Sequence, residues 1–183
     1  MTGLGVMAAL AVLVGWVVFA LLGWVASPAL SAGLGAVVGV LAVALFRESM
    51  AVGGAVALLA PFGVMLPALA LRHVAVSLGV PMAGVATWEL LVFLVLYAVF
   101  LAAAFGVVPL DMYRWGYAPV PVAVMVLAVC GYGFATGNWF LPLVAVLGQA
   151  AWVMGWGSSN WFDYVLHVLM WPVALVVLVG RIF

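Results

Sequence analysis

The sequence predicts an all-α integral membrane protein, a polytopic transmembrane helical bundle of about six or seven spans with minimal extramembrane loops. Of its 183 residues, 72% are apolar and 4% are charged, whereas about a quarter of the residues in soluble domains are charged. The apolar runs lack the alternation of apolar and polar residues that marks a transmembrane β-strand. A helix needs about 20 apolar residues to cross the bilayer, so we expect residues 1–183 to form a single integral membrane domain.

Seven apolar runs are predicted to cross the membrane, at residues 4–25, 30–46, 50–71, 88–108, 122–135, 139–153 and 161–180. The third is expected to be kinked, because Pro61 and Pro67 each lack a backbone donor. Residues 74–86 are expected to form a connector, and residues 109–121 an interfacial loop. Because the fifth and sixth runs are short, residues 122–153 are expected to form either two full crossings or a re-entrant hairpin. The re-entrant hairpin would reduce the number of crossings from seven to five.

Tryptophans support these boundaries, because the indole ring prefers the headgroup level of a bilayer. Six of the nine tryptophans fall at or near predicted span ends, namely Trp24, Trp88, Trp115, Trp139, Trp156 and Trp161. The arginines do not settle the orientation, since seven spans place two of the four on each side. The expected location is a prokaryotic inner membrane.

The balance of charge excludes one class of partner. The formal net charge is zero and the chain contains no lysine, so it offers no basic patch for nucleic acid. Its expected partners are the lipid bilayer and other integral membrane proteins or further copies of itself. The sequence contains no haem, flavin or metal motif, and Cys130 is a single cysteine, which leaves a bound lipid or pigment as the cofactor to consider.

Asp163 and His167 form the best candidate site. In a continuous helix, a spacing of four residues places the carboxylate and the imidazole on one face, within reach of each other. Such a pair serves proton relay or the orientation of a ligand. The alternative is structural: Asn160 caps the helix, and Asp163 at the third position opposes the positive end of the helix dipole.

Three further polar side chains complete the candidate transport or ligand site. Gln149 lies near the middle of a predicted span, where its amide needs a partner on another helix or in a wet cavity. Tyr132 and Tyr164 are expected to line the same path. Glu89 follows the cap candidate Thr87 and is expected at the membrane boundary, because a carboxylate at the bilayer centre costs about 2.5 to 3.5 kcal/mol.

Small residues mark two helix faces that suit close packing. Ser31, Gly35 and Gly39 recur every four residues along one predicted helix, and Gly133 and Gly137 repeat this spacing. Glycine is also a common filler in membrane helices. The pattern leaves open whether the partner helix belongs to this chain or to another subunit.

These observations favour a non-catalytic integral membrane protein, an accessory or scaffold subunit of a larger membrane complex. Loops and chemical motifs are nearly absent, whereas small residues and tryptophans offer extensive contact surface. The alternative is a small-solute, ion or proton-coupled transporter or channel that uses polar residues of the last two helices. An intramembrane enzyme is the least favoured class and needs Asp163 and His167 as acid and base.

Overall fold

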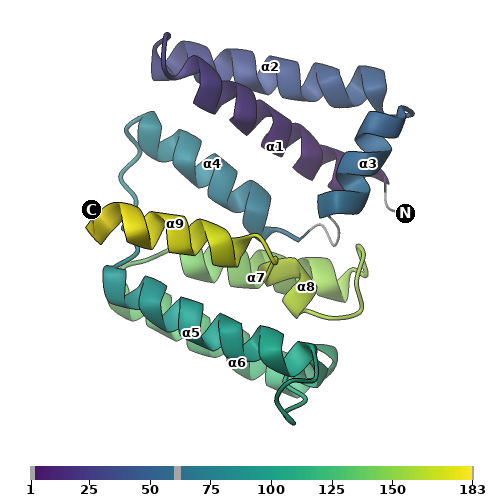
Figure 1. Ribbon diagram of the computed structural model, residues 1–183, viewed down its shortest axis with the longest axis vertical. Helices are drawn as coiled ribbons and strands as arrows, with labels where there is room; N and C mark the ends of the chain where they lie inside the picture. The colour runs from purple at the N-terminus through teal and green to yellow at the C-terminus, as the bar shows by residue number, and fades with distance from the viewer. Residues whose placement is uncertain (1–2, 60–62, 183) are drawn as a thin grey trace.

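The computed structural model contains helices and no strand in the part of the chain that it describes, residues 3–59 and 63–182 (Figure 1). This finding confirms the predicted fold class. The elements in chain order are α1 (Gly3–Leu22), α2 (Pro28–Phe46), α3 (Met50–Leu59), α4 (Met65–Ser77), α5 (Thr87–Ala104), the 3-10 helix η1 (Tyr113–Tyr117), α6 (Pro119–Thr136), α7 (Phe140–Val153), α8 (Phe162–Val165) and α9 (Met170–Ile182).

Several of these helices have the length and composition of membrane spans. In the described residues, the segments long and apolar enough to cross a bilayer are α1, α2, α5, α6 and Phe162–Ile182, which joins α8 to α9. The apolar helices α3, α4 and α7 are shorter. The long helices run back and forth along roughly one direction in Figure 1. The chain is therefore an integral membrane protein whose apolar helices contact the lipid bilayer.

The third predicted span consists of two helices and not of one kinked helix. α3 ends at Leu59 and α4 begins at Met65, so Pro67 lies in the first turn of α4, where a missing backbone donor breaks no helical hydrogen bond. α4 continues to Ser77, beyond the predicted end at residue 71, so part of the expected connector 74–86 is helical. Pro61 lies outside the described residues.

The last predicted span, residues 161–180, is interrupted. α8 ends at Val165, and Leu166 adopts an extended backbone (φ −120°, ψ 147°) before α9 begins at Met170. Pro172 explains this restart, because the first turn of a helix accommodates a proline and its interior does not. A continuous helix through Pro172 would lose the hydrogen bond to the Val168 carbonyl.

α1 and α2 form a closely packed antiparallel hairpin at the top of Figure 1. Ser31, Gly35 and Gly39 are all buried in α2. A Cβ atom at Gly35 would lie 2.5 Å from the Gly15 carbonyl oxygen of α1, so only a glycine allows the backbones to approach this closely. The glycines of this face therefore pack against a helix of the same chain.

Gly133 and Gly137 differ in what surrounds them. A Cβ atom at Gly133 would collide with the ring of Pro142 in α7, so this glycine lets α6 and α7 approach closely. Gly137 adopts a left-handed backbone (φ +69°) directly after α6, and the space around it is open. Gly137 therefore ends a helix and does not pack against one.

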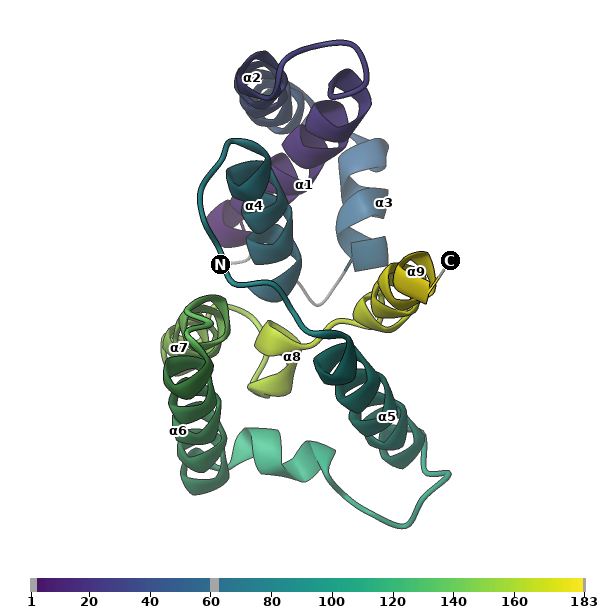
Figure 2. The same ribbon diagram turned by 90° about the vertical axis from the view of Figure 1, so that its left-hand side faces the viewer.

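α4 joins the α1–α2 hairpin to the rest of the molecule, and it lies beside α1 in Figures 1 and 2. The Trp16 indole nitrogen donates to His73 Nδ1 at 2.9 Å. The ring of Phe19 meets the imidazole edge to face, with the ring centroids 5.6 Å apart. His73 thus packs between two aromatic side chains of α1.

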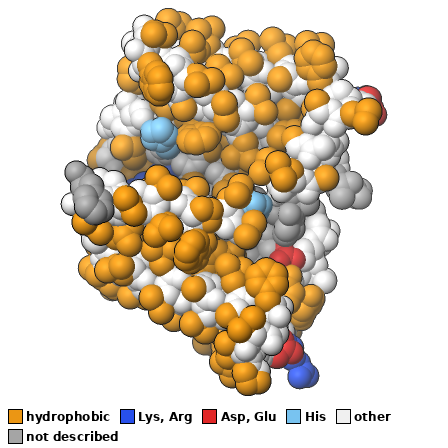
Figure 3. All heavy atoms as spheres, in the orientation of Figure 1, with side chains coloured by type: hydrophobic (Ala, Val, Ile, Leu, Met, Phe, Trp, Pro, Cys, Tyr) orange, Lys and Arg blue, Asp and Glu red, His pale blue; other side chains and the backbone are white. Residues whose placement is uncertain are grey.

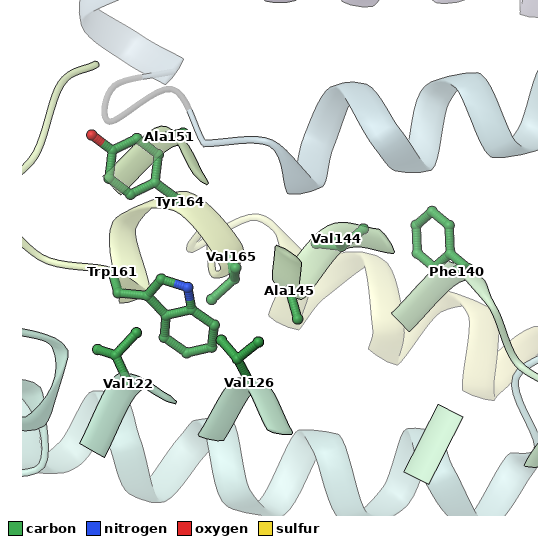
Figure 4. Packing of buried hydrophobic residues seen from close by; sticks show 9 residues of the cluster. All are labelled: Val122, Val126, Phe140, Val144, Ala145, Ala151, Trp161, Tyr164 and Val165. Carbon is green, nitrogen blue, oxygen red and sulfur yellow. The ribbon is translucent and has the colours of Figure 1, made fainter. Parts of the chain in front are cut away.

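The largest core cluster joins α6, α7 and the region of α8 (Figure 4). Trp161 and Val165 point toward Val122 and Val126 of α6, whereas the Tyr164 ring points to the opposite side. Trp161 is 4% exposed, so it belongs to the core and not to an interfacial belt. The other five tryptophans predicted at span ends are all more than half exposed.

The chain exposes more surface than a compact protein of its mass. Its accessible surface is 10968 Å², whereas the scaling for compact monomers gives about 8,400 Å² for this mass. The face shown in Figure 3 is covered almost wholly by apolar side chains. Lipid or another protein must therefore cover this surface.

Candidate functional site

The first polar cluster, the η1 junction, joins the loop before α6 to the loop before α8 and consists of Tyr113, Gly116, Ser158, Asn160 and Asp163. The Tyr113 hydroxyl donates to Asp163 Oδ1 at 2.7 Å, and the Ser158 hydroxyl donates to Oδ2 at 2.5 Å. The Trp161 amide donates to the Gly116 carbonyl at 2.9 Å. These bonds fasten together two loops that lie far apart in the sequence.

Asn160 is fully buried in the η1 junction. Its Nδ2 donates to the Tyr113 carbonyl and its Oδ1 accepts from the Phe162 amide, both at 2.9 Å. Asn160 therefore satisfies a free amide at the start of α8, although the residue directly before this helix is Trp161. Asp163 accepts hydrogen bonds from two side chains of the junction, so its role is to hold the two loops together.

The Asp163 carboxylate also affects Tyr113, which lies outside the membrane-spanning segments. Burial raises the pKa of Tyr113 well above its ordinary value, and the hydrogen bond to Asp163 raises it further. A raised pKa in the folded state means that the tyrosine's contribution to stability is present below its ordinary pKa and is lost as the pH rises through the raised value. The contribution of Tyr113 to the junction should therefore be lost in strongly alkaline solution.

Asp163→Asn is expected to lower the pKa of Tyr113, because the variant removes the adjacent negative charge. Burial remains, so the pKa should stay above that of an exposed tyrosine. Titration of tyrosinate absorbance measures the change, and Tyr113→Phe identifies the contribution of this one residue. Identical titration of Tyr113 in the variant and the unaltered protein would show that the carboxylate does not contact the hydroxyl.

The second polar cluster, the paired breaks, lies where the interruption between α3 and α4 meets the interruption between α8 and α9. It consists of Leu59, Val64, Tyr164, His167 and Leu169. The Val64 amide donates to the Tyr164 carbonyl at 2.8 Å. His167 Nε2 lies 3.1 Å from the Leu59 carbonyl oxygen, and the Leu169 amide donates to His167 Nδ1 at 3.2 Å. Because Nδ1 accepts a hydrogen bond, Nε2 carries the proton and donates to Leu59.

A cavity of about 300 Å³ lies beside the paired breaks, between α1, α4 and α7. Its lining is mostly apolar and includes Gly63 and Tyr164. A Cβ atom at Gly63 would lie 2.6 Å from the Asp163 carbonyl oxygen, so the two interrupted segments touch through their backbones. The Tyr164 hydroxyl donates to the Ser158 carbonyl at 3.0 Å and is therefore already satisfied within the chain.

The expected contact between Asp163 and His167 is absent from this arrangement. α8 ends between the two residues, and each side chain has other partners, the η1 junction for Asp163 and the paired breaks for His167. A spacing of four residues predicts a shared face only in a continuous helix, and here the helix is broken. Gln149 is half-buried in α7 and takes no part in the hydrogen bonds of either cluster.

The third polar cluster lies at the other end of the helices, where α5 begins and α6 ends. The Tyr132 hydroxyl of α6 and the Ala86 amide both donate to the Glu89 carboxylate. Ala86, and not the expected Thr87, is the residue directly before α5. Glu89 reaches back to the amide of that residue, as the acidic partner of a capping box does.

Two arginines hold the connector that leads into α5. Arg72 of α4 donates to the Ala83 carbonyl, and Arg181 of α9 donates to the Val85 carbonyl, each at 2.7 Å. Both arginines directly follow predicted spans, residues 50–71 and 161–180, and no role beyond this position was predicted for either. The connector could have indicated that the arginines bind its backbone. Its carbonyl groups near residues 83–85 make no helical hydrogen bonds and therefore need donors from elsewhere.

No protein-family model, curated protein or solved structure matches this chain. Within residues 3–59 and 63–182, no group of three or more His, Cys, Asp or Glu side chains is placed to hold a metal ion. Function must therefore be inferred from the chain's own surface and polar clusters.

Proposed function

We propose that this protein is a non-catalytic accessory or scaffold subunit that packs against other integral membrane proteins in a complex of a prokaryotic inner membrane. The observation that carries the proposal is the total accessible surface of 10968 Å², about 2,500 Å² larger than that of a compact chain of this mass, on which many large apolar side chains are exposed. Interfaces between permanently associated subunits bury about 2,000 Å² or more. The surplus is therefore large enough for a stable interface.

α2 offers a free apolar face for such an interface. It is the outermost helix of the α1–α2 hairpin in Figures 1 and 2, and its main contact is with α1. The face turned away from α1 carries exposed apolar side chains, which include Leu34, Val37, Val40 and Leu41. A partner helix would bury these side chains and reduce the surplus surface.

The polar groups favour a subunit over a transporter. Asp163 belongs to the η1 junction, His167 to the paired breaks and Tyr132 to the opposite end of the helices. A transport path of the kind predicted requires Asp163, His167 and Tyr132 to converge on one cavity, whereas the three side chains lie in separate places. The alternative of a small-solute, ion or proton-coupled transporter or channel therefore has less support.

Val37→Trp is expected to dissociate the complex, because fluid lipid accommodates a larger ring and a closely packed interface does not. Val124→Trp in α6 is the matched control, since Val37 and Val124 are 56% and 60% exposed. The protein is purified from its native membrane in mild detergent, and light scattering gives the mass of the complex. Mass spectrometry then identifies the proteins bound at a fixed ratio.

Two outcomes bear on the proposal: the first would overturn the subunit function itself, and the second would overturn the interface on α2. One is an unaltered protein that is strictly monomeric, with no other membrane protein at a fixed ratio. The other is a complex that neither tryptophan variant dissociates while both variants still show the thermal unfolding of the unaltered protein. Dissociation by Val37→Trp alone supports an interface on α2.

A further inference from the structure

A cavity at the third polar cluster, the α5–α6 cavity, has no role in the proposed subunit function. Its volume is about 210 Å³, and it lies where the connector before α5 meets the end of α6 and the turn into α7. Its lining includes Trp88, Glu89, Tyr132, Thr136 and Asn138. Polar and aromatic side chains from α5, α6 and the turn into α7 thus meet around one small space.

Hydrogen-bond acceptors dominate the polar lining of the α5–α6 cavity. The Glu89 carboxylate accepts from the Tyr132 hydroxyl and the Ala86 amide, one bond to each oxygen. A carboxylate oxygen has two lone pairs, so both oxygens can accept again. The Thr136 hydroxyl uses its proton in a 2.9 Å bond to the Tyr132 carbonyl and has only acceptor capacity left. The cavity therefore suits a ligand that donates hydrogen bonds.

Asn138 gives an independent indication of such a ligand. Its side chain is 3% exposed and lines the cavity, and its Oδ1 has no hydrogen-bond partner among the described residues. Buried polar atoms in proteins nearly always have a partner, because an unsatisfied buried acceptor loses its interaction with water and gains nothing in return. The oxygen itself has almost no accessible surface, so a ligand with N–H groups would supply the missing donor once the amide group turns toward the cavity.

The aromatic side chains of the cavity favour a positively charged ligand. The rings of Trp88 and Tyr132 lie edge to face, with centroids 6.3 Å apart and an interplanar angle of 83°. The face of an aromatic ring attracts cations, and aromatic rings combined with a carboxylate are a common setting for organic ammonium groups. An ammonium group therefore matches the carboxylate, the free acceptors and the rings together.

The surroundings of the cavity also contain positive charge. Arg72 and Arg181 are bonded to carbonyls of the connector that forms one wall. A positive group bound at Glu89 and a negative group near the guanidinium groups would match a zwitterion. Trp88 is 56% exposed at the start of α5, as expected for an indole at the level of lipid headgroups.

We propose that the α5–α6 cavity binds an organic ammonium group, carried either by the headgroup of a zwitterionic phospholipid or by a free amine. The ammonium group donates hydrogen bonds to Glu89 and to Asn138 Oδ1, and it lies against the ring of Trp88. This site is independent of the proposed subunit function, because it uses neither the α1–α2 hairpin nor a second protein.

Thermal unfolding of the purified full-length protein in detergent provides the binding assay. Short-chain phosphatidylethanolamine is expected to raise Tm in a saturable manner, whereas phosphatidylglycerol with the same chains is not. Free ethanolamine distinguishes the two sources of the ammonium group. Stabilisation by ethanolamine as strong as by the lipid assigns the site to free amines, and stabilisation by the lipid alone assigns it to a headgroup. Equal stabilisation by both lipids, or none by any probe, would overturn the proposal.

Glu89→Gln is expected to weaken binding about tenfold, the loss of one charge-assisted hydrogen bond. Glu48→Gln removes the same charge from the exposed loop after α2 and should bind as the unaltered protein does. Trp88→Leu, at a half-exposed position, provides a second variant if Glu89→Gln does not fold. Unchanged affinity in every folded variant of these two cavity residues would exclude the site.

Discussion

Gly39→Leu is expected to lower the free energy of unfolding by about 3 kcal/mol, at the upper end of the usual cost of overpacking. A Cβ atom at this position would meet the Ala11 carbonyl oxygen and lie 2.8 Å from the Gly15 amide nitrogen. Both contacts are with the backbone of α1, so no side chain can rotate to make room. The hairpin must open, and unfolding in detergent with increasing dodecyl sulfate measures the loss.

Gly33→Leu is the matched control, because Gly33 lies in the same helix and a Cβ atom there meets nothing within 4 Å. This variant should be as stable as the unaltered protein or slightly more stable, because leucine favours a helix over glycine. If both variants lost the same stability, leucine itself and not the contact with α1 would be responsible.

Gly63→Ala is expected to cost about 3 kcal/mol as well, because it separates the paired breaks. The new methyl group would meet the Tyr164 carbonyl oxygen and lie 2.6 Å from the Asp163 carbonyl oxygen. The hydrogen bond from the Val64 amide to Tyr164 would be lost with this contact. Unfolding in detergent measures the cost, and hydrogen exchange of the Val64 amide should become faster.

Gly54→Ala in α3 provides the comparison, since the space around Gly54 is open. Alanine favours a helix over glycine by about 1 kcal/mol, so this variant should be as stable as the unaltered protein or slightly more stable. Fast exchange at Val64 already in the unaltered protein, together with unchanged stability in Gly63→Ala, would show that the two interrupted segments do not touch.

Hydropathy alone located the long helices closely. The first two were predicted at residues 4–25 and 30–46 and occur at Gly3–Leu22 and Pro28–Phe46. Apolar runs report helix positions well, because each backbone polar group in a membrane needs a partner within its own helix. The same argument fails at the two interrupted spans, where the Leu59 carbonyl accepts from His167 and the Val64 amide donates to the Tyr164 carbonyl.

The candidate site was predicted less well than the helices. The sequence singled out Asp163, His167 and Tyr132, and each of them does make a specific hydrogen bond. Their partners, however, are Tyr113, the Leu59 carbonyl and Glu89, which lie far away in the sequence. Helical spacing describes neighbours along one helix and carries no information about such partners.

The sequence by itself determined the surrounding medium and the helical class, because apolar composition acts locally. Only the tertiary structure decided where two helices are interrupted and which groups satisfy the freed backbone. The reason is physical: a polar group removed from water needs a partner, and a partner supplied by a distant segment makes a broken helix stable where an unbroken one was expected.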